Sequence, residues 1–571
     1  MPNSRLKIFT FFVIFIFLAL VSRLFYWQVI KGHDLAKAAQ GQYGAGLTIS
    51  APRGSILASD ESFLVARGEA YLVFAETPKL KDTPKNIANA LAPFFVEDAE
   101  DRSAVLDEVA RIEGLLTKKG VMWVPLKQKV SSEIKRSIEA LAVAGVGFEA
   151  KEDRVYPEAS VAAHLLGFVG KDQEGNDTGY FGLEGFYDLT LEGKPGFERR
   201  ENDALGRLIA VGENKEIGAI DGVNLITHID KTVQLSIEKR LKAGIERYGA
   251  KAGTVIVMDP KNGAVLGMES YPSYDPKEYS KFGNELFKNP AVSSSFEPGS
   301  VFKILVMASA LDAGVVEPDT KCDICTGPLK VDKYQIETWD GKYFPDSTMT
   351  DVIKHSDNVG MAFVGQKLGV DKLYDYLNNF GIGSLTGIDL QGEAAPKIRE
   401  KGTWNIVDLA TAAFGQGIAL TPIEFIRAAA AIANGGVMVT PEVVDKLSVD
   451  GWEDDIAPQI GKRVISQTAA AEITAMMAEA AKNGEAKWTY LKGFKVAGKT
   501  GTAQIPIAGH YDPEKTVASF VGFAPYDNPK FIMLVTLREP QSSPWASETA
   551  APLWYSLAQD LFPYFGIQPE P

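Results

Sequence analysis

The sequence predicts an α+β protein in three parts: one N-terminal transmembrane helix, an elongated mixed α/β pedestal, and a domain in which helices flank an antiparallel sheet. Three observations support this fold class. A long apolar run stands near the N-terminus, residues 33–225 mix short strands with amphipathic helices, and five apolar strands with helices between them follow in residues 226–571. A chain of 571 residues is also too long for a single hydrophobic core.

The composition indicates a folded protein and limits the classes of partner that it could bind. Hydrophobic residues make up 46% of the chain, which is ordinary for a globular protein and gives no sign of bulk disorder. The formal net charge of −14 argues against nucleic acid or an anionic lipid surface as the main partner. The chain holds only two cysteines, so no disulfide framework supports the fold.

The N-terminal apolar run has the features of a retained membrane anchor. Arg5 and Lys7 precede residues 8–21, and the apolar run resumes over residues 24–30. Its length would also fit the core of a signal peptide, but no clear Ala-x-Ala cleavage site follows, and the aromatic residues of the second part suit a membrane interface. We therefore expect residues 1–32 to form a short cytoplasmic tail and a single pass through the cytoplasmic (inner) membrane. The basic residues before the run place the remainder of the chain outside the cytoplasm.

Residues 33–225 contain no nucleophile next to a base. The sequence predicts a turn into a strand at 51–57, a helix within 130–143 and an exposed loop at 171–179. We interpret this part as a pedestal or interaction module with a solvated, charged surface.

The strand pattern of residues 226–571 predicts the antiparallel sheet. Residues 254–258 and 264–268 are apolar strands joined by a turn at 259–263, which is typical of a hairpin. Further strands are expected next to Lys499, at 517–523 and at 531–536, with helices at 232–248 and 554–561.

Cys322 and Cys325 lie close together in the expected extracytoplasmic part. They could form a small-loop disulfide, act as a redox pair or stay free. A zinc site would need two more ligands, and the five histidines show no metal-binding spacing. We expect a local disulfide or two free thiols, no metal and no cofactor.

The segment around Ser300 predicts a reactive serine at the start of a helix. Pro298 and Gly299 fit the beginning of the helix and Gly314 fits its end, so Ser300 should lie in the first turn. Residues three apart share a helix face, so Lys303 can place its amine beside the Ser300 hydroxyl. This arrangement is a nucleophile next to its base.

The Ser-x-x-Lys pattern is specific only through its position in the chain. It occurs four times, but only the copy at Ser300 is followed by Ser-Asp-Asn at 356–358 and Lys-Thr-Gly-Thr at 499–502. Singly, each motif has a plain structural explanation as a helix cap, a turn or a strand end. Together and in this order, they form the signature of penicillin-binding proteins and class A β-lactamases.

The expected chemistry explains why each predicted catalytic residue is of its type. A serine hydroxyl needs a base to take its proton, and Lys303 can serve only if its pKa is lowered. Burial beside a second cation would do this, and Lys499 supplies one. Ser356 can relay a proton between the two lysines and the leaving amine, while Asn358 donates to the substrate amide.

The residues after Lys499 suit substrate binding. Lys499, Thr500 and Thr502 can hold a substrate carboxylate, and Gly501 lets the substrate backbone lie close to the strand edge as an added strand. The backbone N–H groups of Ser300 and Thr502 would form the oxyanion hole, in which each donor is worth roughly 3–4 kcal/mol.

Further short motifs extend along the chain. They are Arg53-Gly54, Arg154-x-Tyr156-Pro157, Ala163-His164-Leu165-x-Gly167, Gly182-Leu183-Glu184-Gly185, Gly193-x-x-Gly196, Gly415-Gln416-Gly417, Thr421-Pro422, Asn434-Gly435-Gly436 and Ala550-Ala551-Pro552. With these motifs nearly the whole chain resembles the class B penicillin-binding proteins, the monofunctional peptidoglycan D,D-transpeptidases of bacteria. It departs from their usual Asp-Arg-Asn-Gly turn, because Ala-Ser-Asp-Glu stands at 58–61.

The resemblance implies acyl transfer in two steps, with Ser300 as the acylated nucleophile and Lys303 as the base. Ser300 attacks the carbonyl of the penultimate D-Ala of a stem peptide and releases the terminal D-Ala, and an amine from a neighbouring strand then takes the acyl group. β-Lactams would mimic the D-Ala-D-Ala end and trap the serine. The implied partners are a polytopic glycan polymerase, reached through the membrane helix and pedestal, and other proteins of the cell-wall complex.

Several functional alternatives remain open. The modest size and the sequence Phe-Gly-Gln-Gly at 414–417 favour the septal (division) branch of the family over the elongation branch. A β-lactamase would hydrolyse the acyl-enzyme, but it would not need a long membrane-tethered pedestal. A non-catalytic β-lactam sensor or scaffold would have almost no cytoplasmic tail with which to signal.

Overall fold

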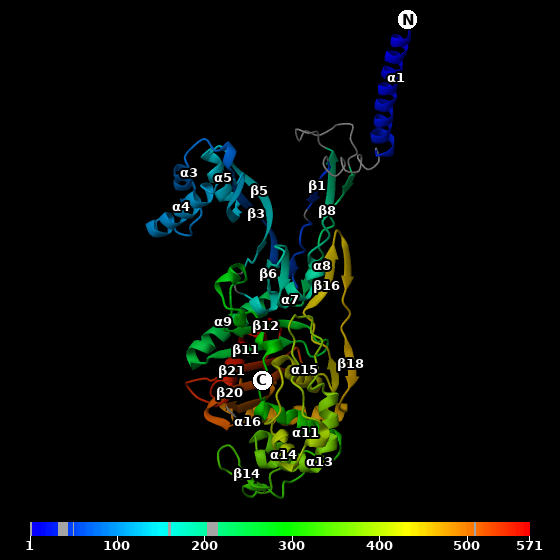
Figure 1. Ribbon diagram of the computed structural model, residues 1–571. Coiled ribbons are helices and arrows are strands. Elements are labelled where there is room, and N and C mark those ends of the chain that lie inside the picture. Colours follow the sequence, from blue (N-terminus) through cyan, green and yellow to red (C-terminus); the bar gives the residue numbers. More distant parts are fainter. Residues whose placement is uncertain are drawn as a thin grey trace. The chain divides into compact units, whose positions relative to one another are not determined.

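The structure is a computed structural model that describes residues 3–31, 44–49, 51–157, 161–201, 215–507 and 510–570. Figure 1 shows its helices and strands along the chain. The chain divides into two compact units. The first comprises Met1–Arg53 and Glu192–Gly222, and the second comprises Gly54–Leu191 and Val223–Pro571.

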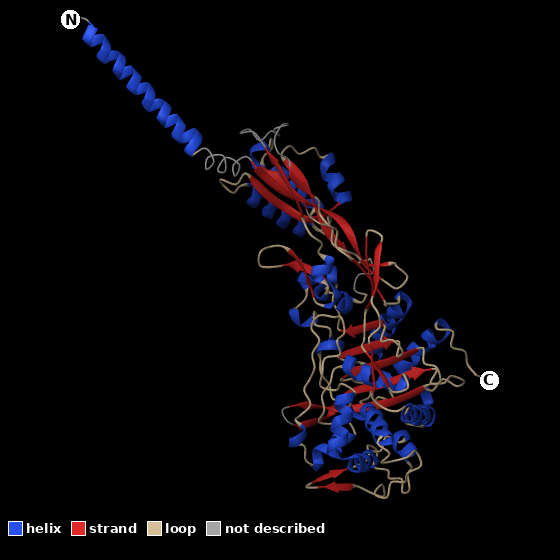
Figure 2. Cartoon of the chain, turned by 90° about the vertical axis from the view of Figure 1, so that its right-hand side faces the viewer, coloured by secondary structure: helices blue, strands red, loops and turns tan. Residues whose placement is uncertain are grey.

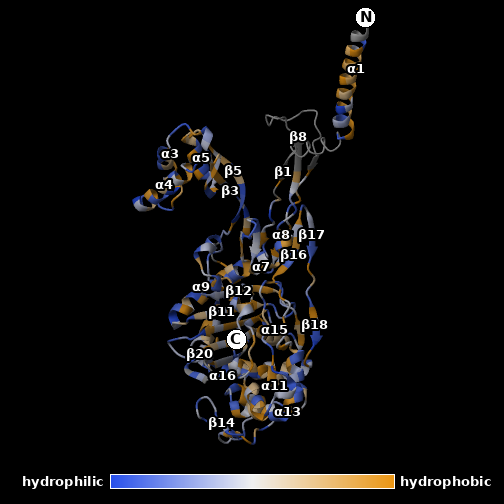
Figure 3. Ribbon diagram, viewed as in Figure 1, coloured by the Kyte–Doolittle hydropathy of each residue, from blue (hydrophilic) through white to orange (hydrophobic). Residues whose placement is uncertain are grey.

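The first unit begins with a long apolar helix. Helix α1 (Asn3–Phe25) continues into a π-helical turn, η1 (Tyr26–Ile30). The segment Lys7–Ile30 is long and apolar enough to cross a membrane, and orange predominates along this helix in Figure 3. Large side chains such as Phe11 are exposed along it. This helix fits a single-pass membrane anchor by its length and its apolar composition.

A small antiparallel sheet completes the described part of the first unit. Its strands are β1 (Gly44–Ile49), β8 (Gly196–Glu201) and β9 (Lys215–Ile217), with β8 in the centre. Because β1 and β8 are far apart in sequence, this pairing has no local signature.

An α/β subdomain in the second unit is built around β3 (Phe63–Glu76). At 14 residues, β3 is longer than the short strands expected there. It pairs antiparallel with β4 (Trp123–Ser131) and with β5 (Val146–Val155). Side chains of these strands share a hydrophobic core with three helices, namely α3 (Pro84–Leu91), α4 (Arg102–Leu116) and α5 (Ser132–Ala140).

The expected loop at 171–179 is wrong in part. Residues 168–180 form a β-hairpin of β6 (Phe168–Lys171) and β7 (Asp177–Tyr180). Its first and last residues, Phe168 and Tyr180, pair directly, and their rings stack with centroids 5.8 Å apart. The polar turn dominated the local pattern, whereas the aromatic pair that holds the strands together spans the whole stretch.

The sheet that contains β3, β4 and β5 has seven strands and also connects distant parts of this unit. Strand β2 (Ile56–Leu57) pairs antiparallel with β3 and parallel with β10 (Asn224–Thr227). Strand β10 then pairs with β16 (Val444–Val449), and β16 pairs with β17 (Trp452–Asp455). Segments almost 400 residues apart therefore share one sheet, which the chain pattern did not predict.

The predicted antiparallel sheet flanked by helices is confirmed. Its five strands run in the order β12-β11-β21-β20-β19, and every neighbouring pair is antiparallel. The expected hairpin is β11 and β12. Figure 2 shows these strands side by side with helices around them. Their bounds are β11 (Ala252–Met258), β12 (Val265–Tyr271), β19 (Ala497–Ile507), β20 (His510–Ala524) and β21 (Phe531–Arg538).

Alternation along β11 shows how the sheet holds two helix layers. Val255 and Val257 face one hydrophobic core, and Ile256 and Met258 face another, because successive strand side chains point to opposite faces. The first layer contains α9 (Lys231–Tyr248) and α17 (Ala550–Tyr564). The second contains α11 (Lys303–Asp312), α13 (Asn358–Asn379), α15 (Pro422–Ala433) and α16 (Gln467–Asn483).

The other described helices and strands are short. They are α6 (Ala163–Leu166), α7 (Gly182–Phe186), α8 (Asp188–Leu191), α10 (Pro290–Ser293), α12 (Met349–Lys354), α14 (Ile406–Ala413), β13 (Leu329–Val331), β14 (Tyr334–Ile336), β15 (Val437–Val439) and β18 (Ile460–Arg463).

Candidate active site

Ser300 lies in a tight turn that leads into α11. Residues Gly299–Phe302 form a 3-10 turn, and the α-helix proper begins at Lys303. Gly299 has a φ of +57°, and a Cβ there would lie 3.0 Å from the carbonyl oxygen of Thr502. Its N–H donates to the carbonyl of Gly415 at 3.0 Å. The close approach of these backbones explains the glycine before the predicted nucleophile.

The Lys303 amine is completely buried and points toward the Ser-Asp-Asn segment. Its Nζ donates to Ser356 O at 2.6 Å, to Ser356 Oγ at 3.3 Å and to Asn358 Oδ1 at 2.8 Å. Among the described residues, no hydrogen bond joins it to Ser300. Burial, followed by the nearby Lys499 cation, lowers the pKa of Lys303 to about 7. A neutral amine is therefore available near pH 7.

Ser356 occupies a strained position between two helices. It follows α12 and has a φ of +56°, which is uncommon for a residue other than glycine. Asp357 then caps α13 by accepting from the N–H groups of Val359 at 2.8 Å and Gly360 at 3.1 Å. The cap holds Ser356 and Asn358 at the N-terminal end of α13, where both meet Lys303.

Lys499 reaches the same point from β19. It is 2% exposed, and its Nζ donates to Ser356 Oγ at 2.9 Å, to Thr500 O at 3.0 Å and to Thr500 Oγ1 at 3.2 Å. Burial lowers the pKa of Lys499, and the Glu485 carboxylate 4.0 Å away opposes that effect. The Ser356 hydroxyl thus lies between two amines and can pass a proton between them.

The remaining predicted residues follow along the edge strand β19. Thr500 Oγ1 donates to the Glu485 carboxylate, and Thr502 Oγ1 accepts from the Ala546 N–H at 3.0 Å. A Cβ on Gly501 would lie 2.7 Å from Val301 N, so this glycine lets the strand pack against the turn that carries Ser300. This packing is a second reason for a glycine at position 501, in addition to the predicted close approach of the substrate backbone.

One pocket collects residues from all three motifs. Ser300, Asn358 and Thr502 line it, so the structure brings the predicted nucleophile, amide and oxyanion-hole segment together. Its full lining is Gly299, Ser300, Trp339, Asn358, Phe414, Gln416, Glu485, Thr502, Trp545 and Ser547. Lys303, Ser356, Lys499 and Thr500 lie behind this surface and are buried.

Sequence reasoning missed several lining residues. Trp339 and Trp545 lie beside each other with ring centroids 5.2 Å apart and ring planes tilted by 58°, and both are partly exposed. Glu485 follows α16 and reaches Lys499 and Thr500. None of the three belongs to a motif, so only their tertiary positions identify them. Over the described ranges, no group of His, Cys, Asp and Glu side chains could hold a metal ion.

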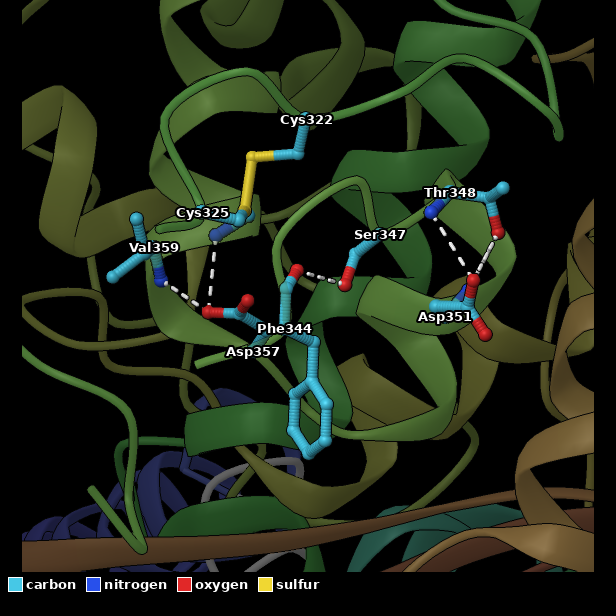
Figure 4. The surroundings of a disulfide bond; sticks show 9 residues. Cys322, Cys325, Phe344, Ser347, Thr348, Asp351, Asp357 and Val359 are labelled. Carbon is cyan, nitrogen blue, oxygen red and sulfur yellow. Dashed lines mark hydrogen bonds between the residues drawn. A yellow bond between two sulfur atoms is a disulfide. The ribbon is translucent and has the colours of Figure 1, made fainter. Parts of the chain in front are cut away.

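The two cysteines lie beside the Ser-Asp-Asn segment. Cys322 and Cys325 form a disulfide and are buried, so the first of the two expected alternatives is the one observed. The Cys322 N–H donates to Ser347 O at 2.9 Å. Figure 4 shows the disulfide, Ser347 and the capping Asp357 in one neighbourhood. The disulfide therefore closes a small loop next to a segment predicted to be catalytic.

Family models match most of the chain. The model described as penicillin binding protein transpeptidase domain matches residues 253–559, and the one described as penicillin-binding protein dimerisation domain matches residues 48–227. Stage V sporulation protein D of Bacillus subtilis is 31% identical over 99% of this chain and 86% of its own length. A probable peptidoglycan D,D-transpeptidase, PenA of Neisseria meningitidis, is 28% identical over 94% of this chain and 88% of its own.

Solved structures share the fold. Penicillin-binding protein 3 of Mycobacterium tuberculosis, solved with aztreonam, has a TM-score of 0.70 at 24% identity and covers 92% of this chain and 98% of its own. Penicillin-binding protein 2X of Streptococcus thermophilus has a TM-score of 0.73 at 23% identity, and the match covers 92% of this chain and 83% of that chain. With both family models matched in order and relatives aligned along almost the entire length, the chain belongs to the class B penicillin-binding proteins, a family of serine-type peptidoglycan D,D-transpeptidases.

Proposed function

We propose that this protein cross-links peptidoglycan stem peptides through an acyl-enzyme on Ser300. The observation that carries the proposal is the buried Lys303, whose pKa of about 7 lets it act as a base one turn from Ser300. A lysine with an ordinary pKa would be protonated and unable to accept the serine proton.

The contacts support a two-step mechanism. Lys303 accepts the proton of the Ser300 hydroxyl while Ser300 Oγ forms a bond to the carbonyl carbon of the penultimate D-Ala. Ser356 lies within 3.3 Å of Lys303 Nζ and 2.9 Å of Lys499 Nζ, so it can pass a proton to the amine of the departing D-Ala. An acceptor amine then attacks the acyl carbon, loses its proton by the same route and regenerates Ser300.

The substrate is held along β19 and α13. Lys499, Thr500 and Thr502 bind its terminal carboxylate, and the N–H groups of Ser300 and Thr502 stabilise the oxyanion. Asn358 Nδ2 donates to Glu337 O at 2.9 Å, which leaves its second N–H for a substrate carbonyl.

The membrane anchor and pedestal suit work at the outer face of the cytoplasmic membrane. On this proposal residues 1–32 anchor the chain, residues 33–225 form the pedestal, and residues 226–571 form the transpeptidase domain. The pedestal and anchor would contact a polytopic glycan polymerase and other cell-wall proteins.

The septal branch is the more specific part of the proposal. The Phe-Gly-Gln-Gly sequence at 414–417 contributes two residues, Phe414 and Gln416, to the pocket. Depletion of the protein in its host should produce filaments with failed septa. Round cells would instead indicate the elongation branch.

A fluorescent penicillin tests the catalytic assignment. Wild type should form a stable covalent adduct, and Ser300→Ala should form none. Ser236→Ala is the matched control, because Ser236 also begins a Ser-x-x-Lys pattern but donates to Asp560 at 2.9 Å. Labelling that survives Ser300→Ala, or disappears with Ser236→Ala, would contradict the assignment. Rapid release of the adduct would favour a β-lactamase.

A further inference from the structure

Glu485 places a negative charge inside the candidate active site. It follows Gly484, the residue that ends α16, and it lines the pocket that contains Ser300. A Cβ on Gly484 would lie 2.8 Å from Lys354 O, so the loop packs tightly against the end of α12. The Glu485 side chain is 17% exposed, so its carboxylate is largely shielded from water.

The carboxylate contacts two of the three residues predicted to hold the substrate carboxylate, Lys499 and Thr500. Its Oε2 accepts from Thr500 Oγ1 and lies 4.0 Å from Lys499 Nζ. A threonine hydroxyl has one proton, so Thr500 can donate to Glu485 or to a substrate carboxylate, but not to both at once. In the free enzyme, Glu485 therefore occupies the interactions that the substrate would use.

We propose that Glu485 is a positioning residue that acts as the built-in counter-charge of Lys499 in the free site and gives up the Thr500 hydroxyl to the carboxylate of the incoming substrate. The inference rests on the proposed function, since it concerns how that site is prepared for a carboxylate-bearing donor peptide. Without Glu485, the buried Lys499 would lose the carboxylate 4.0 Å from its amine until the substrate arrived, and a buried cation that lacks such a partner is costly in a dry site.

The charge of Glu485 also acts on the base. The charged groups that face the two lysines from the surrounding elements are the lysines themselves, Glu485 after α16 and Asp357 before α13. Glu485 raises the pKa of both Lys303 and Lys499 against the effect of burial. Removing its charge should lower both pKa values.

Both limbs of the pH profile move in the same direction when the Glu485 charge is removed. Acylation needs neutral Lys303, so a lower Lys303 pKa extends activity to more acidic pH. It also needs charged Lys499, so a lower Lys499 pKa ends activity at less alkaline pH. The whole profile should therefore move to lower pH.

The experiment measures the rate constant of penicillin acylation against pH for the full-length protein. Glu485→Gln keeps an oxygen acceptor for Thr500 but removes the charge, and both limbs should shift down by roughly one pH unit. Glu485→Asp keeps the charge and should lie nearer wild type. Glu479→Gln is the matched control, because Glu479 lies on the same helix α16 and contacts Asn483 instead of the site. Its profile should match wild type.

Two results would overturn the inference in distinguishable ways. A Glu485→Gln variant that acylates with the wild-type pH profile shows that Glu485 only anchors the loop, and the proposed function stands. A wild-type protein that forms no penicillin adduct overturns the proposed function, and the inference falls with it. If Glu485→Gln is poorly folded, Glu485→Asp is compared with Glu485→Ala, which removes the charge. A Glu485→Asp profile displaced from wild type as far as the Glu485→Ala profile would equally contradict the role of charge.

Discussion

The Lys303 amine shows how the fold lowers the pKa of the proposed base. Full burial disfavours its charged form, and the Lys499 cation adds to that effect, so the pKa falls from 10.5 to about 7. Lys303 Nζ also donates to Ser356 and Asn358, which fixes its direction. The acylation rate should accordingly rise with pH through the neutral range.

Lys303→Arg should abolish the base while keeping the charge. A guanidinium stays protonated at every accessible pH, so it cannot accept the Ser300 proton. We expect penicillin acylation to fall by orders of magnitude, while the folded protein persists. Stopped-flow or gel-based acylation rates would measure the loss, and circular dichroism would check the fold. Near wild-type acylation by this variant would remove Lys303 from the role of base.

Lys499→Ala should reveal whether the second lysine tunes the first. Removing this cation takes away the repulsion that lowers the Lys303 pKa, so the residual acylation should rise with pH to a higher apparent pKa. Lys499→Arg keeps the charge and should retain more activity and a profile nearer wild type. The measurement is the acylation rate from pH 5 to pH 10. An unshifted profile with merely weaker β-lactam binding would make Lys499 an anchor only.

At the scale of secondary-structure elements, three segments of the pedestal subdomain meet at Arg154. This residue of β5 donates from Nε to Glu184 of α7 at 2.9 Å and from Nη1 to Gly54 O at 2.7 Å. The side chains of Arg154 and Glu184 are buried, with exposed fractions of 8% and 0% respectively. The short motifs that contain these residues are far apart in the sequence, and the structure shows that they make one contact.

Arg154→Ala should destabilise this subdomain strongly. It removes the guanidinium that donates to the buried Glu184 carboxylate, and breaking a buried ion pair typically costs roughly 3–5 kcal/mol. Arg399→Ala is the control: Arg399 bridges Asp408 at 2.7 Å but is 52% exposed, so its loss should cost roughly 1 kcal/mol or less. Chemical denaturation would compare the two. Equal effects would show that burial does not set the strength of the Arg154 contact.

At the scale of the whole molecule, the apolar α1 predicts the topology. The basic residues Arg5 and Lys7 precede it, so the tail should remain in the cytoplasm and the rest of the chain should lie outside. Protease added to intact spheroplasts should digest everything beyond about residue 32 and leave a cytoplasmic marker protein whole. Protection of the segment around Ser300 would contradict this topology.

Much of the fold follows from short-range patterns. The β11–β12 hairpin, helices α9 and α17 and the apolar α1 were predictable because strand alternation, helix periodicity and apolar length are properties of consecutive residues. The position of Ser300 and Lys303 at the start of α11 was predictable for the same reason. Their meeting with residues 356–358 and 499–502 was inferred from motif order, and the structure brings these segments to one pocket.

Other features depend on partners distant in sequence. The pairing of β2 with β10 and of β10 with β16 leaves no local signature, and the β6–β7 hairpin was hidden by its polar turn. Glu485 and the Trp339–Trp545 pair belong to no motif. The cysteine spacing left a disulfide and free thiols equally open, and only the position of the two sulfurs in space separates them.

The sequence by itself predicted the fold class, the apolar helix that fits an anchor and the candidate reactive groups, because these rest on side-chain chemistry and on periodicity over a few residues. The tertiary structure alone decided that Lys303 is fully buried, that its amine faces Ser356 and Asn358, and that Glu485 stands opposite Lys499. Burial and charge separation set the pKa values, and both depend on which segments pack together. A motif names the base, and the packing around it sets the pH at which it can act.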